Sequence, residues 1–111
     1  MIYHFCPRDE FSADAEQYIT DTLETQGFIH CSPKGHVHVS ATMRARGRTD
    51  LVVLEIDEAL LSAPAVWEDG DPPDPDGRLF PHVYGPIPTQ AVVAVHDLRP
   101  RPDGSFAPLR Q

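Results

Sequence analysis

The run Leu51–Ile56 (LVVLEI) near the middle of the chain constrains the fold more than any other feature. Five of its six residues are apolar, and it contains no glycine or proline. A short, nearly continuous apolar run is typical of a strand that is buried on both faces. The run therefore predicts a central strand, with a packed layer on each side of the sheet.

Weaker strand signals lie on both sides of this run. They cover Ile2–Phe5, Phe28–Cys31, Ala65–Glu68, Phe80–Tyr84 and Ala91–Leu98, with Ser105–Ala107 as a last short edge strand. Helices are expected over Arg8–Ala15 and Val37–Ala45, whereas Tyr18–Leu23 is ambiguous and could form a short strand. Strands outnumber helices, so the predicted fold class is α+β, with a small mixed or antiparallel sheet and a few short helices.

The length and composition limit the domain organisation and the partners. A chain of 111 residues fits a single domain spanning 1–111. The segment Asp69–Gly77 alternates acids with prolines and glycines, which predicts a surface loop. The apolar runs are too short to cross a bilayer, and the two cysteines form no disulfide framework, so we expect a cytoplasmic protein. The sequence leaves the oligomeric state open.

The net charge of −8 makes nucleic acid an unlikely partner, because phosphate neutralisation requires clustered basic side chains. The one basic cluster is Arg44, Arg46 and Arg48. It is large enough to hold one phosphate-bearing small ligand, but it does not form a nucleic-acid surface.

Polar residues on the predicted strands follow a pattern. Successive side chains of a strand point to opposite faces, so His30 shares a face with Ser32, and His82 shares one with Tyr84. The first strand adds His4. Each histidine taken alone is compatible with a core residue bonded to the backbone. Three of them, together with the neighbouring Trp67-Glu68, predict a shared cleft suited to acid–base work or ligand positioning.

Two other kinds of site are disfavoured by geometry. His36-Val37-His38 has a metal-ligand spacing on a strand, but on a helix the two rings diverge by about 200°. We read this segment as helix or turn, and no metal is expected. Cys31 and His30 are adjacent on a strand and face opposite sides, which excludes a nucleophile pair.

Several segments occur in the order typical of the domain of unknown function 952 family, which this chain resembles over nearly its whole length. They are Ile2–Phe5, Gly27–Ser32, Asp50–Asp57, Trp67-Glu68 and Phe80–Pro86. That family is regarded as related to the ADP-ribosyltransferase fold, with RNA 2′-phosphotransferases among its nearer relatives. The resemblance therefore implies an ADP-ribosyltransferase-like fold and NAD as a cofactor. RNA is not expected as a substrate, because Gln26-Gly27 stands where the phosphotransferases carry an arginine.

The resemblance also implies roles for individual residues. His4 and Ser32 would position ribose hydroxyls, while His30 and the His82–Tyr84 segment would line the cleft. Tyr84 or Trp67 would stack on nicotinamide, and Glu68 would supply negative charge. Arg44 or Arg46 would contact phosphate. The implied function is an NAD- or nucleotide-handling transferase acting on a small molecule or a protein. The alternative is a non-catalytic ligand- or partner-binding domain that has lost the reaction.

Overall fold

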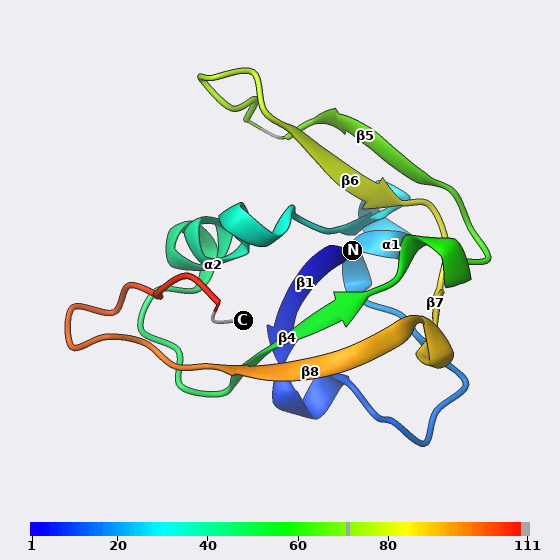
Figure 1. Cartoon of the computed structure of the whole chain (residues 1–111), viewed down its shortest axis with the longest axis horizontal. Helices are drawn as coiled ribbons and strands as arrows, with labels where there is room; N and C mark the ends of the chain where they lie inside the picture. The colour runs from blue at the N-terminus through cyan, green and yellow to red at the C-terminus, as the bar shows by residue number, and fades with distance from the viewer. Residues whose placement is uncertain (71, 110–111) are drawn as a thin grey trace.

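The computed structural model describes residues 1–70 and 72–109. Its central sheet has the strand order β1-β4-β8, with β4 (Leu51–Ile56) between β1 (Ile2–Pro7) and β8 (Val92–Leu98) (Figure 1). Both pairings are antiparallel, and β4 opposes His4 with Leu54 and His96 with Val53. The prediction of a central strand at Leu51–Ile56 is confirmed.

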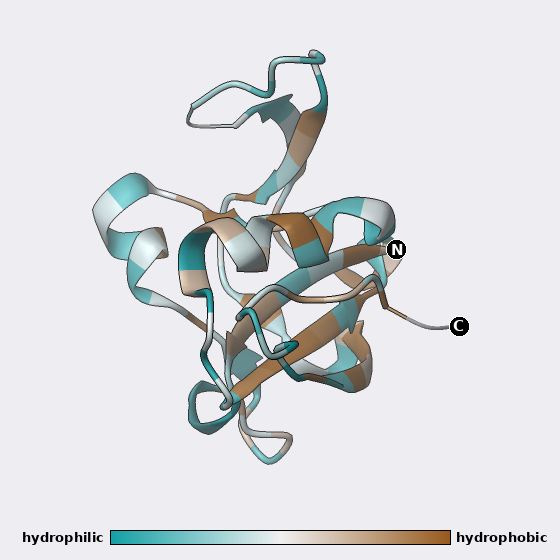
Figure 2. Cartoon of the chain, turned by 90° about the vertical axis from the view of Figure 1, so that its left-hand side faces the viewer, coloured by the Kyte–Doolittle hydropathy of each residue, from teal (hydrophilic) through white to brown (hydrophobic). Residues whose placement is uncertain are grey.

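The strand β4 is buried from both faces of its sheet, as its apolar run predicts. Leu54 and Ile56 belong to one hydrophobic cluster, whereas Leu51 and Val53 belong to a second cluster on the other face. Figure 2 shows the hydrophobic stretches mainly in the strands and the hydrophilic ones mainly in the loops. Burying each such aliphatic side chain contributes about 1.5–3 kcal/mol, so this strand anchors the fold.

A second sheet has the order β3-β6-β5, formed by β3 (Ile29–His30), β6 (Leu79–Val83) and β5 (Ala65–Asp69), all antiparallel. Tyr3 and Ser32 join the two sheets, because each N–H donates to the other's carbonyl at 2.9 and 2.7 Å. A small pair, β2 (Gln17–Tyr18) and β7 (Ile87–Pro88), lies beside them. In Figure 1 the β5–β6 hairpin extends away from the body of the molecule.

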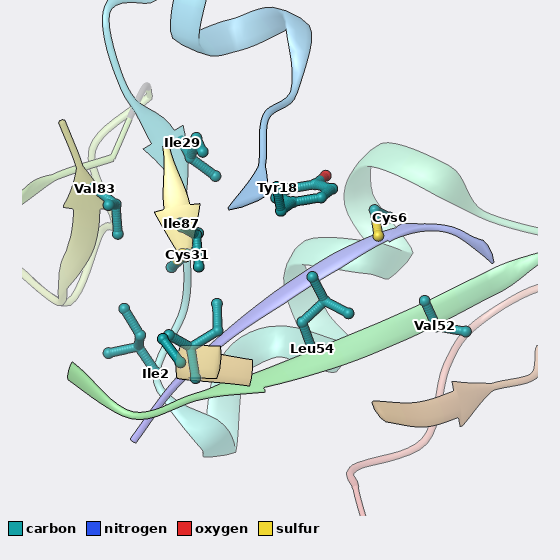
Figure 3. Close-up of a cluster of buried hydrophobic side chains, with 11 residues drawn as sticks. Ile2, Cys6, Tyr18, Ile29, Cys31, Val52, Leu54, Val83 and Ile87 are labelled. Atoms are coloured by element: carbon teal, nitrogen blue, oxygen red, sulfur yellow. The ribbon is translucent and has the colours of Figure 1, made fainter. Parts of the chain in front are cut away.

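The first hydrophobic cluster unites all three sheets. Figure 3 shows side chains of β2, β3, β6 and β7 gathered beside β1 and β4, with Tyr18, Ile29 and Val83 near Leu54 and Ile2. Apolar contacts therefore hold the second sheet against the first, in addition to the single bridge between Tyr3 and Ser32. This shared core determines where the second sheet presents its histidines.

Within residues 1–70 and 72–109, two α-helices complete the fold. α1 (Asp21–Gln26) ends at Gly27, whose φ of 89° is the left-handed conformation that glycine adopts most easily. α2 (Val37–Ala45) packs its buried residues Val37 and Ala41 against the central sheet. Four 3-10 turns, η1 (Arg8–Glu10), η2 (Lys34–His36), η3 (Glu58–Leu60) and η4 (Thr89–Ala91), link these elements. Within the described residues, no helix is long and apolar enough to span a bilayer.

The fold class predicted from the sequence, α+β with antiparallel sheets and few helices, is confirmed. Three element predictions are wrong or incomplete. The expected helix over Arg8–Ala15 is only the turn Arg8–Glu10, and the Ser12 hydroxyl accepts from the Asp14 N–H in a local bond that competes with a helix. The ambiguous Tyr18–Leu23 segment divides between β2 and α1, which begins at Asp21.

The third difference concerns the end of the chain. The expected strand Ser105–Ala107 is reduced to one bridge between Pro100 and Phe106. The segment predicted as a surface loop does follow β5 as irregular chain, although Asp71 within it lies outside the described residues.

Candidate functional site

A pocket of about 550 Å³ lies between β1, α2, and the β5–β6 hairpin with its loop. This volume is within the range of about 300–1,000 Å³ typical of small-molecule sites. Five residues singled out from the sequence line it: His4, His30, Ser32, Arg44 and His82. Three others, Trp67, Glu68 and Tyr84, do not line it.

The three strand histidines converge on this pocket. His30 of β3 lies directly opposite His82 of β6, and their ring centroids are 5.2 Å apart in an edge-to-face arrangement. His4 of β1 donates from Nδ1 to the backbone carbonyl of His30 at 2.6 Å. The tertiary structure thus brings together residues that are separated by up to 78 positions in the chain (82 − 4).

His4 is neutral and held by protein partners at both ring nitrogens. Because a carbonyl can only accept, Nδ1 carries the proton, and Nε2 accepts from the hydroxyl of Tyr18 at 2.8 Å. Burial lowers the pKa of His4, which favours this neutral form. Both nitrogens are engaged, so His4 contributes shape and position to the pocket wall. The sequence analysis did not identify Tyr18, whose pairing arises only from the fold.

His82 belongs to a hydrogen-bonded group that extends outward from the pocket. Oε1 of Glu68 accepts from Nδ1 of His82 at 2.7 Å and also from the hydroxyl of Tyr84. These two bonds lower the pKa of Glu68, and the same carboxylate raises the pKa of Tyr84. The Phe28 ring stacks on His82 with centroids 4.2 Å apart. His82 itself is only 3% exposed.

Trp67 lies on the opposite face of β5 from Glu68 and donates from Nε1 to Glu58 at 3.3 Å. Adjacent strand residues point to opposite faces, so only one of the pair Trp67-Glu68 can share the face of His82. This alternation could be read from the sequence, but the sequence analysis treated Trp67 and Glu68 as a pair on one cleft.

The loop end of the pocket contains His36, which the sequence analysis considered only as a metal ligand, and Phe80, which it did not assign to the cleft. His36 and Phe80 line the pocket with ring centroids 5.2 Å apart, and Nη1 of Arg78 lies 3.2 Å from Nδ1 of His36. Arg78 also lies 3.6 Å from the carboxylate of Asp74. Burial and the neighbouring guanidinium lower the pKa of His36. These contacts join the turn η2 to the hairpin and its loop, a pairing that no local pattern indicates.

The second wall of the pocket comes from α2. Val39, Ser40, Met43 and Arg44 face the pocket, and the Ser40 hydroxyl lies 3.3 Å from that of Ser32. The wall therefore combines apolar surface with two hydroxyl groups and a guanidinium. Ser40 is a further pocket residue that the sequence analysis did not identify.

The charges that line the pocket differ from those of the whole chain. Four of the six histidines, His4, His30, His36 and His82, line it together with Arg44. Among the described residues, Asp74 is the single lining carboxylate, although the chain has 17 acidic residues. An anionic ligand with planar groups suits this composition, because imidazoles and a guanidinium offer donors and flat surfaces.

Neither cysteine is available as a thiolate. Cys31 lines the pocket but is buried, and burial raises its pKa. Burial likewise raises the pKa of Cys6 to about 11. Within residues 1–70 and 72–109, no group of three or more potential metal ligands is close enough to hold a metal ion.

The fold and the pocket define a small α+β domain in which two bridged antiparallel sheets and one helix enclose a histidine-rich small-molecule pocket. The chain belongs to the family described as "Protein of unknown function (DUF952)", whose match covers residues 5–95. The matched range includes every lining residue discussed above except His4.

Solved structures of protein CC0527 from Caulobacter crescentus are similar to this chain. The crystal structure shares 28% identity with a TM-score of 0.81, covering 96% of this chain and 92% of that one. The solution NMR structure shares 29% identity with a TM-score of 0.68, covering 94% and 89%. A search of the curated proteins found no match.

Proposed function

We propose that this protein binds a nucleotide-type ligand, NAD or ADP-ribose, in the histidine-lined pocket and acts as an ADP-ribosyltransferase-like enzyme on a small molecule or protein. The observation that carries the proposal is the local concentration of four histidines and Arg44 in a chain of net charge −8. The guanidinium of Arg44 can pair with the negative charge of a pyrophosphate, and imidazole N–H groups can donate to its oxygens. The resemblance of the strand motifs to the ADP-ribosyltransferase fold supports the same ligand.

The apolar part of the pocket suits the rings of such a ligand. Phe80 and Met43 line it, and Phe5 extends the aromatic surface beside His4, with ring centroids 6.4 Å apart. Aromatic and imidazole faces stack on planar bases, while the hydroxyls of Ser32 and Ser40 can bond sugar hydroxyls. This is the division between flat apolar and polar contacts that a nucleoside requires.

Thermal-shift titration tests the proposal, with NAD, ADP-ribose and uncharged adenosine as separate ligands. A ligand at a hundredfold excess over its dissociation constant stabilises the native state by about 2.7 kcal/mol. In a domain of this size we expect the unfolding midpoint to rise by several degrees with NAD and ADP-ribose, and less with adenosine. Midpoints unchanged by both anionic ligands would contradict the proposal.

A pair of arginine variants makes the test specific. Arg44→Gln removes a cation that lines the pocket and should reduce the shift with ADP-ribose. Arg48→Gln removes the same charge from an exposed arginine that pairs with Asp50 at 2.6 Å, outside the pocket. It should leave the shift unchanged. Equal effects of both variants would indicate general electrostatics instead of a pocket contact.

One observation favours a second candidate, a binding domain without turnover. Glu68 does not line the pocket, so the carboxylate expected to stabilise an oxocarbenium-like centre does not directly face a ligand there. Release of nicotinamide from bound NAD distinguishes the two candidates. A midpoint shift without nicotinamide release supports the binding domain.

A further inference from the structure

We propose that His82 is the general base that activates a hydroxyl acceptor, water included, and that Glu68 and Tyr84 act through it as positioning residues. This inference rests on the proposed function, in which NAD occupies the pocket. It gives Glu68 a role that is compatible with its position outside the pocket. It also names the class of acceptor, a group with an O–H bond.

The hydrogen bond from His82 to Glu68 determines which ring nitrogen is available. A carboxylate with a lowered pKa is ionised and can only accept, so Nδ1 of His82 carries a proton in the bond of 2.7 Å. The neutral ring then has its lone pair on Nε2. Glu68 lies outside the pocket, whereas His82 lines it. Because Nδ1 is directed to Glu68, we infer that the Nε2 side of the ring faces the pocket.

The ring of His82 is fixed by its surroundings. Phe28 stacks on it at 4.2 Å with an interplanar angle of 22°, and His30 contacts it edge to face. Tyr84 donates to the same carboxylate oxygen as His82 and so restrains Glu68. Phe28 also packs against Tyr84, with centroids 5.3 Å apart. A base held in this way loses little freedom when it meets an acceptor.

Other candidate bases in the pocket are less suited to the role. Both ring nitrogens of His4 are bonded to protein groups, and the Nε2 of His30 lies 2.8 Å from the amide oxygen of Gln26. Cys31 is protonated because burial raises its pKa. Nδ1 of His36 faces the Arg78 guanidinium. His82 is the histidine of this group that is backed by a carboxylate.

Transfer of the ADP-ribosyl group from NAD to the hydroxyl acceptor needs no further reagent. Nε2 of His82 takes the proton of the acceptor hydroxyl. At the same time, the oxygen of that hydroxyl forms a bond to C1′ of the nicotinamide ribose. The C1′–N bond breaks, and its electron pair neutralises the positive charge of the pyridinium, so nicotinamide leaves unprotonated. The imidazolium of His82, stabilised by Glu68, then releases its proton to solvent. With water as acceptor the products are ADP-ribose, nicotinamide and one proton.

The first test needs no ligand. Nitrogen NMR of histidine-labelled protein at pH 8 reports which ring nitrogen carries the proton. We expect His82 to be protonated at Nδ1, and Glu68→Ala to shift it toward the Nε2–H form that free histidine prefers. Glu68→Gln keeps an acceptor oxygen and should retain the Nδ1–H form. A wild-type His82 protonated at Nε2 would overturn the proposal.

The second test measures nicotinamide release from NAD under single-turnover conditions. General base catalysis contributes at least about 100-fold, so His82→Asn should lower the rate constant by about that factor, while the midpoint shift with NAD persists. Glu68→Ala should lower it as well, with partial recovery in Glu68→Gln.

The chain provides a matched control in its other histidine–glutamate pair. His96 and Glu55 lie 2.8 Å apart on the central sheet and do not line the pocket. His96→Asn and Glu55→Ala should leave nicotinamide release unchanged. Wild-type rates in His82→Asn would overturn this inference alone. NAD binding without nicotinamide release would overturn the inference and the proposed transferase activity, and would leave the binding domain. Absence of any midpoint shift with NAD in the wild type would overturn the proposed function and the inference together.

Discussion

At the scale of single residues, His4 shows how the fold selects one state of a side chain. The first strand places this histidine next to the backbone of His30 and the hydroxyl of Tyr18, which satisfy both of its nitrogens. A neutral ring is the form that fits, because burial disfavours the charged imidazolium and lowers the pKa of His4. The position of His4 in the pocket wall therefore depends on its remaining neutral.

This arrangement predicts how stability varies with pH. Burial lowers the pKa of His4 in the folded state below its ordinary 6.5, so below about pH 6.5 the unfolded chain binds a proton that the folded chain resists. The stability that His4 contributes is therefore present above that pH and is lost as the pH falls. We expect His4→Gln to be less stable than wild type by about 1–3 kcal/mol at pH 7.5.

Urea unfolding of both proteins from pH 7.5 to pH 5 checks this prediction. The stability difference should shrink toward pH 5, because only the wild type loses the contribution of residue 4. The lowered pKa values of His36 and His38 are common to both proteins and cancel in the difference. A difference that stays constant or grows toward pH 5 would mean that His4 is not held in the neutral form.

The alternation of side chains along a strand was used to place the histidines, but it was not used for the residues of β5. It placed His30 on one face with Ser32 and His82 on one face with Tyr84. The structure then pairs His30 with His82 on neighbouring strands, a pairing that alternation alone did not predict. Applied to β5, it would have separated Trp67 from Glu68, since adjacent residues point to opposite faces. The structure has Trp67 bonded to Glu58 and Glu68 bonded to His82.

At the scale of elements, the connection between β6 and β7 determines how the hairpin joins the body. An added Cβ at Gly85 would lie 2.6 Å from Cβ of Ala63, closer than nonbonded carbons approach. Its φ is not in the left-handed region, so the close approach, and not the backbone conformation, demands glycine here. The hairpin carries His82 and Phe80 into the pocket, which makes this contact relevant to the site.

We expect Gly85→Ala to destabilise the protein by about 1–3 kcal/mol, the usual cost of overpacking. Adding Ala63→Gly in the same chain should recover part of that loss, because it removes the atom that clashes. Gly35→Ala is the control, since nothing lies within 4 Å of its added Cβ. Chemical denaturation of these variants measures each effect. Absence of any recovery in the double variant would contradict the assigned clash.

At the scale of the whole molecule, one hydrophobic cluster crosses all three sheets. It joins Ile29 of β3 and Val83 of β6 to Leu54 and Ile56 of the central strand. The second sheet has few backbone bonds to the first, so its position depends on this shared core. A shared core couples the unfolding of the parts that contribute to it.

This coupling predicts a single cooperative unfolding transition, as the expectation of one domain over residues 1–111 also requires. Trp67 is the only tryptophan of the chain and lies on β5, so its fluorescence reports the hairpin. Far-ultraviolet circular dichroism reports the whole backbone. The two midpoints in urea should coincide. A lower midpoint by fluorescence would show that the hairpin unfolds independently of the central sheet.

The sequence by itself determined the central strand and the face on which each strand histidine lies. These features follow from local periodicity, because a two-residue repeat sets side-chain direction and a continuous apolar run requires burial on both faces. The helix expected over Arg8–Ala15 failed for a local reason as well, since short polar side chains compete for the backbone there.

Only the tertiary structure decided which of these residues meet. The bond from Tyr18 to His4, the approach of Arg78 to His36, and the pairing of Glu68 with His82 join separate elements of the chain. Periodicity gives the direction of a side chain but not its distance from a residue on another element. That distance is set by the packing of the shared core, which positions β3, the β5–β6 hairpin and α2 around one pocket.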